Sequence, residues 1–491
     1  MNFNIDLKDT AGRLNTPWNF GVNTCHAILW TRDDLNRHAK MAARECGFRY
    51  VRFHNTISKH TGIYTEDGEG NPVINFEKFD AVFDNVAACG YLPFFEIGFC
   101  PDALSNHTRD LCYYEADPSV PKSFKTWSYL ISEIVRHCID RYGLEYVKKW
   151  YFEVWNEPDL FYDGTMEDYF TLYDHTVCAV KSVCPDLRVG GPATSKCLWI
   201  DEFIRHIESG SEVTDFKPVA CDFISTHAYP SDVAFLDSDI GDVELLDSDI
   251  MRTLFARVRD AMDKSSLRGK PLFMGEWNSS AGPFAANHDE KNNCAYIIKI
   301  CHDVKDIIDG SLFWNLSDIY EEQGFHYEPF HGGYGLININ DIKKSSFHAF
   351  KMLNELCGDE LRVKSDGGNP GIGALAAYDR ERSEVNAVVY YYCEPGTENG
   401  GAQTVTLNIS SVRTETVPIT VQGVTDESGS AYEWWIKSAS PQFANKALLA
   451  LLEEKSQTKE NRKVLFKDKE GNFTANLSLN PGDSLLVKFK V

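Results

Sequence analysis

Several sequence features that mark other classes of protein are missing from this chain. No apolar run comes near the roughly 20 residues that a membrane-spanning helix needs, and the N-terminus lacks the charged-then-apolar pattern of a signal peptide. There is no P-loop, His-Glu-x-x-His or Gly-x-Ser-x-Gly motif, and no Gly-x-Gly-x-x-Gly follows an early strand. These absences argue against a membrane protein and against nucleotide, zinc-peptidase or serine-nucleophile chemistry.

Paired cysteines are also missing. None of the fourteen cysteines forms a Cys-x-x-Cys pair, and several lie in apolar stretches, among them Cys46, Cys89, Cys178 and Cys301. Buried free thiols fit a reducing compartment better than disulfides or a zinc site. Together with the missing signal peptide they predict a cytoplasmic protein without a metal site, and no motif implies another cofactor.

Positive charge is scarce. The 491 residues carry 49 Lys and Arg against 72 Asp and Glu, which gives a formal net charge of −23. A chain this acidic repels phosphate backbones and anionic lipids, so neither nucleic acid nor a membrane surface is an expected partner. The same charge disfavours a polyanionic substrate. With 43% hydrophobic and 25% charged residues, the composition is that of a globular enzyme.

The first three quarters of the chain alternate short apolar runs with amphipathic helical stretches. The eight candidate strands are 20–23, 50–54, 92–98, 150–155, 188–191, 223–227, 272–276 and 311–316. This alternation predicts an α/β protein whose residues 18–358 form a (β/α)8 TIM barrel. A doubly wound sheet is the alternative, which the missing glycine motif weakens.

The last quarter has a different pattern of polar and apolar residues. Segments such as 385–392, 404–409 and 484–491 alternate polar and apolar residues between turns, which predicts an antiparallel β-sandwich over residues 359–491. One helical insertion is expected at about 441–454. Residues 1–17 read as strand and turn, and we expect them to join the sandwich. No flexible linker separates the two predicted domains.

Two glutamates close strand-like runs in the predicted barrel. Glu157 lies in Trp-Asn-Glu-Pro, and Glu276 lies in Gly-Glu-Trp-Asn. The carboxyl ends of barrel strands form the active-site face, and two facing carboxylates are what glycoside hydrolysis requires. Without that chemistry, the first motif would merely end a strand and the second would form a salt bridge. We predict a sugar hydrolase in which Glu157 is the general acid and Glu276 the nucleophile.

Polar and aromatic residues end further predicted strands. His227 and Tyr229 follow the sixth strand, where they can reach the nucleophile or the sugar. Trp314 ends the eighth strand and offers an aromatic platform for a sugar ring. His54 ends the second strand, and Asn156 can donate to a sugar hydroxyl such as the 2-OH. A single buried histidine is more often structural, but several such clusters on one face favour a binding site.

Loop residues after the eighth strand are weaker candidates. Glu321 and Glu322 can grip outer hydroxyls, although adjacent acids on a loop are usually solvated. The glycine-rich segment 330–335 is expected to be a turn that walls the site, with His331 as a candidate sugar contact.

These motifs resemble glycoside hydrolase family 39, and its β-xylosidases in particular. Similar segments run almost from end to end: 47–52, 155–158, 190–193, 225–229, 276–278, 330–335 and 346–350. The resemblance implies a retaining enzyme with Glu157 as acid/base and Glu276 as nucleophile. It also implies first-subsite sugar contacts from His54, Asn156, His227, Tyr229, Trp314 and Glu322.

The activity implied by the resemblance is that of an exo-acting β-D-xylosidase, which releases xylose from the non-reducing ends of xylo-oligosaccharides and serves xylan degradation. The expected partner is a small oligosaccharide or aryl glycoside, and the family is compatible with a homo-oligomer. Alternatives are an α-L-arabinofuranosidase, β-glucosidase or β-galactosidase, or a non-catalytic carbohydrate-binding protein. Phe53 and Asn55 replace glycines of the family, and the segment 25–27 is also unusual. Because xylose lacks the hydroxymethyl arm of glucose, the feature expected to discriminate these sugars is whether residues such as Phe53 close the space beyond C5.

Overall fold

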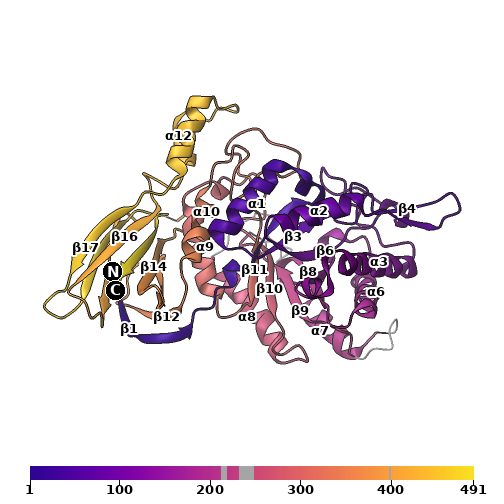
Figure 1. Ribbon diagram of the computed structural model, residues 1–491, viewed down its shortest axis with the longest axis horizontal. Coiled ribbons are helices and arrows are strands. Elements are labelled where there is room, and N and C mark those ends of the chain that lie inside the picture. Colours follow the sequence, from indigo (N-terminus) through magenta and orange to yellow (C-terminus); the bar gives the residue numbers. More distant parts are fainter. Residues whose placement is uncertain (212–217, 232–247, 398–399) are drawn as a thin grey trace.

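The computed structural model describes residues 1–211, 218–231, 248–397 and 400–491, and it consists of a barrel beside a separate sheet (Figure 1). The barrel is closed and all its pairings are parallel. Its strands are β2 (Gly21–His26), β3 (Tyr50–His54), β6 (Leu92–Ile97), β7 (Tyr151–Val154), β8 (Arg188–Thr194), β9 (Phe223–His227), β10 (Leu272–Trp277) and β11 (Gly310–Phe313). The predicted TIM barrel is confirmed.

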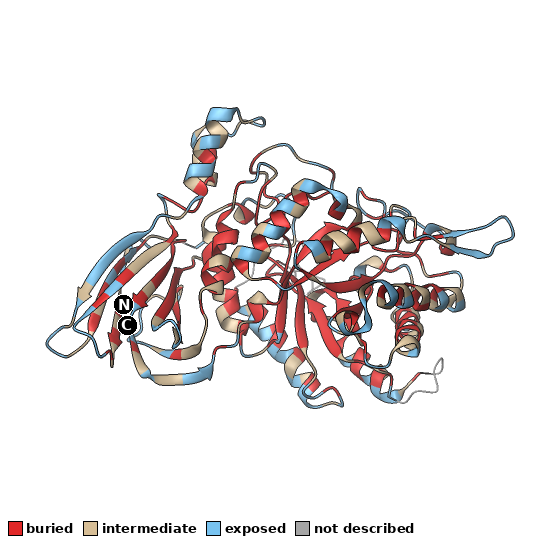
Figure 2. Cartoon of the chain, viewed as in Figure 1, coloured by how far each residue is buried: buried red, intermediate tan, exposed pale blue. Residues whose placement is uncertain are grey.

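Helices surround the barrel. They are α1 (Asp33–Cys46), α2 (Glu77–Ala88), α3 (Phe124–Tyr142), α4 (Leu144–Val147), α5 (Pro158–Phe161), α6 (Met166–Val183), α7 (Ile200–Ser209), α8 (Asp249–Asp263), α9 (Asn292–Val304) and α10 (Ser345–Asn354). A small hairpin of β4 (Tyr64–Glu66) and β5 (Pro72–Ile74) extends from the loop after β3. Short 3-10 turns fill other connections. Figure 2 shows buried residues concentrated on the barrel strands and on the inward faces of these helices.

Local sequence sets several helix ends. Thr165 and Asp168 form a capping box at the start of α6, each side chain accepting the other's backbone N–H. Ser123 caps α3 by accepting from the N–H of Thr126. Gly47 ends α1 with φ of 73°, a left-handed conformation that glycine adopts without steric cost.

The barrel interior is layered. An apolar plug, mostly aromatic, closes the N-terminal ends of the strands: Phe20, Tyr50, Phe94, Tyr151, Phe223, Phe273 and Leu312. Above this plug the inward-facing residues become charged. Along β3, Arg52 and His54 point inward, so the side chain between them, Phe53, points outward. Phe53 packs against Trp30 and Phe83 in the helix layer, with ring centroids 6.1 and 5.6 Å away.

The second sheet has nine strands in the order β17-β16-β19-β14-β13-β12-β1-β15-β18. Their bounds are β1 (Asn2–Arg13), β12 (Asp359–Ser365), β13 (Ile372–Asp379), β14 (Glu384–Tyr391), β15 (Gln403–Ser410), β16 (Thr416–Val424), β17 (Asn461–Phe466), β18 (Phe473–Leu479) and β19 (Ser484–Lys490). The sheet curves around one apolar core, and its edge strands β17 and β18 contact each other.

One pairing in this sheet differs from the antiparallel prediction. β1 runs antiparallel to β12 but parallel to β15, and every other pairing is antiparallel. β1 comes from the far end of the chain, so no hairpin fixes its direction relative to β15. The sheet is therefore mixed.

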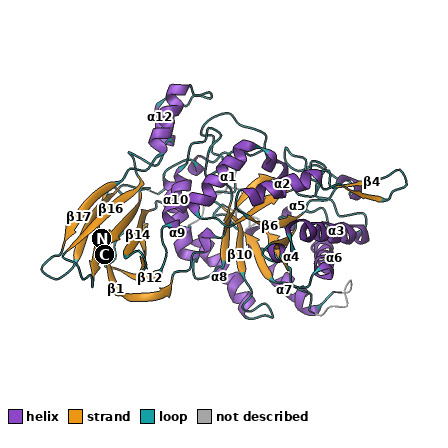
Figure 3. Ribbon diagram, viewed as in Figure 1, coloured by secondary structure: helices purple, strands orange, loops and turns teal. Residues whose placement is uncertain are grey.

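The helical insertion also differs from the prediction. Two helices lie between β16 and β17, namely α11 (Tyr432–Lys437) and α12 (Lys446–Ser456), and α12 projects from the body of the molecule (Figure 3). Ala439 and Ser440 between them have positive φ values of 65° and 47°. Two such residues ahead of Pro441 cannot continue a helix, which is why the insertion is split.

The barrel and the sheet share a packed boundary. The barrel's apolar cluster continues into residues of β13, β14, β16 and β19, including Leu375, Val388 and Leu486. Tyr296 of α9 packs on Tyr392 with ring centroids 5.7 Å apart, and Lys291 pairs with Asp483 at 2.9 Å. The sheet thus supports the helices behind β10 and β11.

Candidate active site

Glu157 sits in an unusual backbone conformation just beyond β7. Trp155 and Glu157 have positive φ values of 71° and 42°, and the N–H of Glu157 donates to Ala193 O at 2.8 Å. Pro158 then starts α5 directly after it. Non-glycine residues held in this region are costly and cluster at functional sites. The turn carries the carboxylate over the barrel opening, three residues past the last strand residue, Val154.

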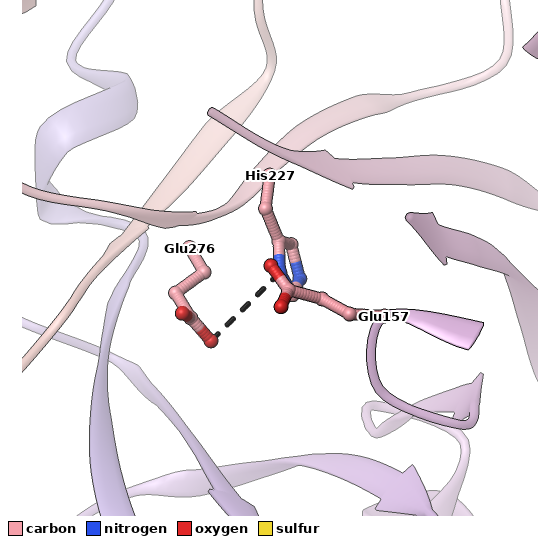
Figure 4. Close-up of side chains that lie close together, drawn as sticks. All are labelled: Glu157, His227 and Glu276. Carbon is pink, nitrogen blue, oxygen red and sulfur yellow. Dashed lines mark hydrogen bonds and ion pairs between the residues drawn. The ribbon is translucent and has the colours of Figure 1, made fainter. Parts of the chain in front are cut away.

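Glu276 lies inside β10, and its carboxylate faces that of Glu157 (Figure 4). Single ligand atoms of Glu157, His227 and Glu276 all lie within 4.8 Å of one another. The side chains of Glu157 and Glu276 remain 11% and 10% exposed, so both carboxyl groups are largely withdrawn from solvent. One oxygen of Glu157 lies within 4.8 Å of one oxygen of Glu276, which suits the closely spaced carboxyl pair of a retaining glycosidase, about 5–5.5 Å apart.

Hydrogen-bond donors surround Glu276. Tyr229 Oη donates to Glu276 Oε1 at 2.7 Å, and Arg52 Nη1 donates to Oε2 at 3.4 Å. His54 Nε2 lies 3.8 Å from the same Oε2. A hydroxyl donor and a guanidinium both stabilise a negative carboxylate. This arrangement favours ionised Glu276.

Glu157 has fewer such partners. Burial, with the nearby Asp159 carboxylate as the next cause, raises the pKa of Glu157 to about 8. Burial also raises the pKa of Glu276, with the carboxylate of Glu157 adding to the effect. Two carboxylates this close cannot both ionise freely, so one proton is retained between them. We assign that proton to Glu157, because Tyr229 and Arg52 both donate hydrogen bonds to Glu276 and stabilise its ionised form.

His227 bridges the pair. Its Nδ1 lies 2.9 Å from Glu157 Oε1 and 3.8 Å from Glu276 Oε2. Burial lowers the pKa of His227 to about 4, so the ring is neutral at pH 7 and does not add a charge to the site. A Cβ on Gly275 would lie 3.2 Å from this ring, which explains why glycine precedes the glutamate.

Comparison with known proteins now assigns the family. The sequence model of Glycosyl hydrolases family 39 matches residues 1–472. The chain belongs to glycoside hydrolase family 39. A β-xylosidase of Caldicellulosiruptor saccharolyticus is 32% identical over 498 residues, which cover 100% of this chain and 98% of the relative. A β-xylosidase of Geobacillus stearothermophilus is 34% identical over 446 residues, covering 89% and 85%.

A solved structure extends the family likeness to three dimensions. The crystal structure of a monomeric β-xylosidase from Caulobacter crescentus CB15 superimposes with a TM-score of 0.89 at 31% identity, covering 99% of both chains. This family 39 chain is therefore a glycoside hydrolase built on the barrel-and-sheet architecture of its relatives.

A buried charged layer supports the family 39 site from below. Arg52 Nε donates to Glu153 Oε2 at 2.5 Å, Nη2 lies 3.0 Å from Glu96 Oε2, and Nη2 donates to Asn156 Oδ1 at 2.8 Å. The Arg52 guanidinium thus links strands β6 and β7 to Asn156, the residue that precedes Glu157. Sequence reasoning missed Glu96 and Glu153 as functional supports, although each is an acid inside an otherwise apolar strand, which was the available signal.

His54 and Trp314 lie beside this layer. His54 Nδ1 contacts Glu96 Oε2 at 2.6 Å; burial alone would lower the pKa of His54, but the Glu96 carboxylate raises it above its usual value. The Trp314 ring lies 4.8 Å from the His54 ring, centroid to centroid. The structure therefore brings five of the six expected sugar contacts, all except Glu322, into the network around the two catalytic candidates.

Glu322 lies farther out, on the loop after β11. It is half-buried and accepts a hydrogen bond from Tyr320 Oη, whose ring is 6.3 Å from Trp314. Its neighbour Glu321 is not solvated, contrary to the usual pattern for adjacent loop acids. Glu321 Oε1 lies 2.5 Å from His26 Nδ1 in a buried contact.

Among the described residues, Glu157, His227 and Glu276 are also the group whose ligand atoms are spaced as metal ligands would be. The fit to a cation is poor. Glu276 already accepts a hydrogen bond from the Tyr229 hydroxyl and faces the Arg52 guanidinium, and a positive charge so close would repel a metal ion. These donors suit a pair of carboxyl groups in which one is ionised and the other is protonated.

Proposed function

We propose that this chain is a retaining, exo-acting β-D-xylosidase that releases xylose from the non-reducing ends of xylo-oligosaccharides. The observation that carries the proposal is the pair formed by Glu157 and Glu276, with carboxylate oxygens within 4.8 Å and different hydrogen-bond partners. Of the two carboxyl groups, Glu157 carries the proton, and the ionised Glu276 is placed to attack.

In the first step, an oxygen of Glu276 forms a bond to the anomeric carbon as the bond from that carbon to the leaving oxygen breaks. Glu157 gives its proton to the leaving oxygen. Tyr229 and Arg52 hold Glu276 ionised and oriented before the attack. The pKa of Glu157 near 8 keeps its proton in place at neutral pH.

In the second step, water attacks the anomeric carbon from the side that the leaving group vacated. Glu157, now ionised, takes a proton from that water while the bond between Glu276 and the sugar breaks. Two inversions at one carbon give net retention. Asn156 and His54 are proposed to hold sugar hydroxyls during both steps, Trp314 to support the ring, and Glu322 to bind from the rim.

The sugar is proposed from the relatives and from the charges at the site. Two relatives that match most of this chain carry the name β-xylosidase. The buried cation nearest the two glutamates, Arg52, is already paired with Glu96, Glu153 and Glu276. It has no capacity left for a uronic carboxylate, so a neutral sugar suits the site.

Phe53 does not discriminate xylose from larger sugars in the way the sequence suggested. Its side chain is 1% exposed and lies between β3 and the helix layer, so it does not close the space beyond C5. The departure from the family pattern at this position is a packing change.

The panel that tests the proposal measures initial rates on p-nitrophenyl β-D-xyloside, α-L-arabinofuranoside, β-D-glucoside and β-D-galactoside. We expect the xyloside to be cleaved fastest, with proton NMR showing the β-anomer of xylose as the first product. Faster cleavage of another glycoside would mean that xylose is not the preferred sugar. The α-anomer as the first product would refute the retaining mechanism. No cleavage of any of the four glycosides would favour a binding protein.

The proposal includes a cytoplasmic location. All fourteen cysteines are free thiols in the structure, which suits a reducing compartment. Searching the described ranges finds no helix with the length and apolarity to cross a bilayer. Growth on xylo-oligosaccharides followed by fractionation tests the location, and activity in the secreted fraction would refute it.

A further inference from the structure

Exposed aromatic side chains gather on one face of the molecule. Seven Phe and Tyr residues of the described chain are highly exposed, and five of them lie on loops at the C-terminal face of the barrel or on the α11–α12 insertion beside it. We call these five the aromatic rim: Tyr113 (63% exposed), Phe284 (42%), Phe325 (41%), Tyr327 (61%) and Phe443 (72%).

The rim is assembled from four separate segments. Tyr113 comes from the loop after β6, Phe284 from the loop after β10, and Phe325 and Tyr327 from the loop after β11. Phe443 comes from the connection between α11 and α12. Loops that follow parallel barrel strands lie on the face that carries the catalytic residues. Three of the four segments are therefore on the same side of the barrel as Glu157 and Glu276.

The rings meet one another across these segments. Tyr113 and Phe325 have ring centroids 6.4 Å apart, and Tyr327 and Phe443 have centroids 6.2 Å apart. Phe284 reaches the same loop through His326, at 4.4 Å. These spacings are typical of interacting aromatic pairs, so the rim is an organised surface.

The rim is joined to the site by direct contacts. The N–H of Tyr113 donates to Glu322 O at 2.7 Å, and Glu322 accepts from Tyr320, whose ring is 6.3 Å from that of Trp314. Phe325 follows Glu322 by only three positions. The inner edge of the rim thus adjoins Glu322, the outermost of the expected sugar contacts.

Five exposed rings in one region are costly for a protein that presents them to water alone, and such patches mark binding surfaces. Glu322 and Glu328 lie on the loop that carries Phe325 and Tyr327, and the Arg32 guanidinium lies over the Phe325 ring at 5.7 Å, so the rim offers no field of a single sign to a charged ligand. A sugar ring presents apolar C–H faces that an aromatic side chain can cover, and it carries no charge when neutral. The chemistry fits a neutral oligosaccharide.

We infer that the aromatic rim binds the sugar units on the leaving-group side of the scissile bond, and that Phe443 brings the C-terminal domain into the substrate site. This inference rests on the proposed function, since it assumes that a glycan enters the site at Glu157 and Glu276. The enzyme then favours oligosaccharides that are long enough to reach the rim.

Three single variants test the rim: Phe325→Ala, Tyr327→Ala and Phe443→Ala. The measured quantity is kcat/KM for xylotetraose divided by kcat/KM for xylobiose, because xylobiose is too short to span the rim. We expect the ratio to fall about 3- to 10-fold for each variant, which is the range that one aromatic contact contributes. Phe466→Ala is the matched control, since Phe466 is 73% exposed but lies on β17 of the second sheet.

A binding measurement separates this inference from the proposed activity. Calorimetric titration of xylotetraose into Glu276→Gln should show 3- to 10-fold weaker binding when Phe443→Ala is added. Weaker binding to the variant that carries Phe443→Ala, together with no turnover by the wild type, would refute the proposed activity but support binding at the aromatic rim. An unchanged kcat/KM ratio and unchanged affinity in all three variants would contradict sugar binding at the aromatic rim. Light scattering that shows Phe443→Ala dissociating an oligomer without a change in the ratio would contradict it as well.

Discussion

At the scale of single residues, the site distinguishes two chemically identical side chains by their surroundings. Glu276 receives a hydroxyl hydrogen bond from Tyr229 and faces Arg52, whereas Glu157 sits on a strained turn beside a neutral His227. The pKa values follow: burial raises both, and that of Glu157 reaches about 8. One carboxyl group can therefore donate a proton at the pH where the other attacks.

The pKa of Glu157 predicts a basic limit to activity. With an aryl xyloside whose leaving group needs protonation, kcat/KM should fall as the pH rises through about 8, because Glu157 loses the proton that it must donate. Glu157→Gln should lower this rate by roughly 10²–10⁴-fold and remove that basic limb. The check is a pH–rate profile of both proteins. A basic limb near 8 that persists in the variant would assign the titration to another group.

Tyr229→Phe tests the hydrogen bond to Glu276. Losing one donor to a charged group should lower kcat roughly 10- to 100-fold, because the carboxylate is then less stabilised. The pKa of Glu276 should rise as well, so the acid limb of the kcat/KM profile should move to higher pH. A lower rate with no movement of the acid limb would mean that Tyr229 acts on the sugar and not on Glu276.

At the scale of elements, a second buried network fixes the loop that walls the site. Lys344 at the start of α10 pairs with Asp289 at 2.5 Å and with Asp318 at 3.1 Å, and all three side chains are fully buried. Asp289 and Asp318 accept the N–H groups of Gly332 and Gly335. A Cβ on Gly335 would meet the backbone of Asp318 at 2.3 Å, so only glycine fits there. The same loop carries the Tyr334 ring to within 6.2 Å of the Trp314 ring.

Lys344→Met should destabilise the protein by about 3–5 kcal/mol, because it leaves two carboxylates buried without their cation. Lys351→Met, on the same helix, removes an ion pair to Glu45 in which the lysine side chain is 35% exposed, and should cost no more than about 1 kcal/mol. Urea unfolding measures both. Equal losses in the two variants would contradict the account of the buried network.

Several elements could be predicted from sequence because their signals are local. The eight barrel strands follow apolar runs, and β3 and β9 match the expected 50–54 and 223–227 to the residue. The outward direction of Phe53 also follows from the period of a strand, once Arg52 and His54 are known to point inward. The pairing of Arg52 with Glu96 and Glu153 was not predictable, because apolar runs give the order of the barrel strands but not which side chains meet inside the barrel.

At the scale of the whole molecule, the chain closes on itself. β1 lies between β12 and β15 in the second sheet, so the first residues complete a domain formed by the last ones. The strand-and-turn pattern of residues 1–17 indicated that they join the second sheet. The parallel pairing with β15 was beyond reach, because it depends on contacts between residues some 400 positions apart.

Ile5→Ala tests the part that β1 plays. Ile5 is 1% exposed and lies opposite Val363 and Ile409, so its truncation should cost about 2–5 kcal/mol of stability. Asn4→Ala changes the neighbouring outward-facing side chain and should stay within about 0.5 kcal/mol. Thermal unfolding compares the two. Similar stability of both variants would mean that β1 is only loosely attached.

The proposed mechanism depends on a covalent bond between Glu276 and the sugar. The most direct measurement is mass spectrometry of the protein after incubation with an activated 2-deoxy-2-fluoro-β-xyloside, followed by peptide mapping. We expect one added fluoroxylosyl unit on the peptide that contains Glu276, and no added unit in Glu276→Ala. Rapid turnover with no adduct, or an adduct on Glu157, would contradict it.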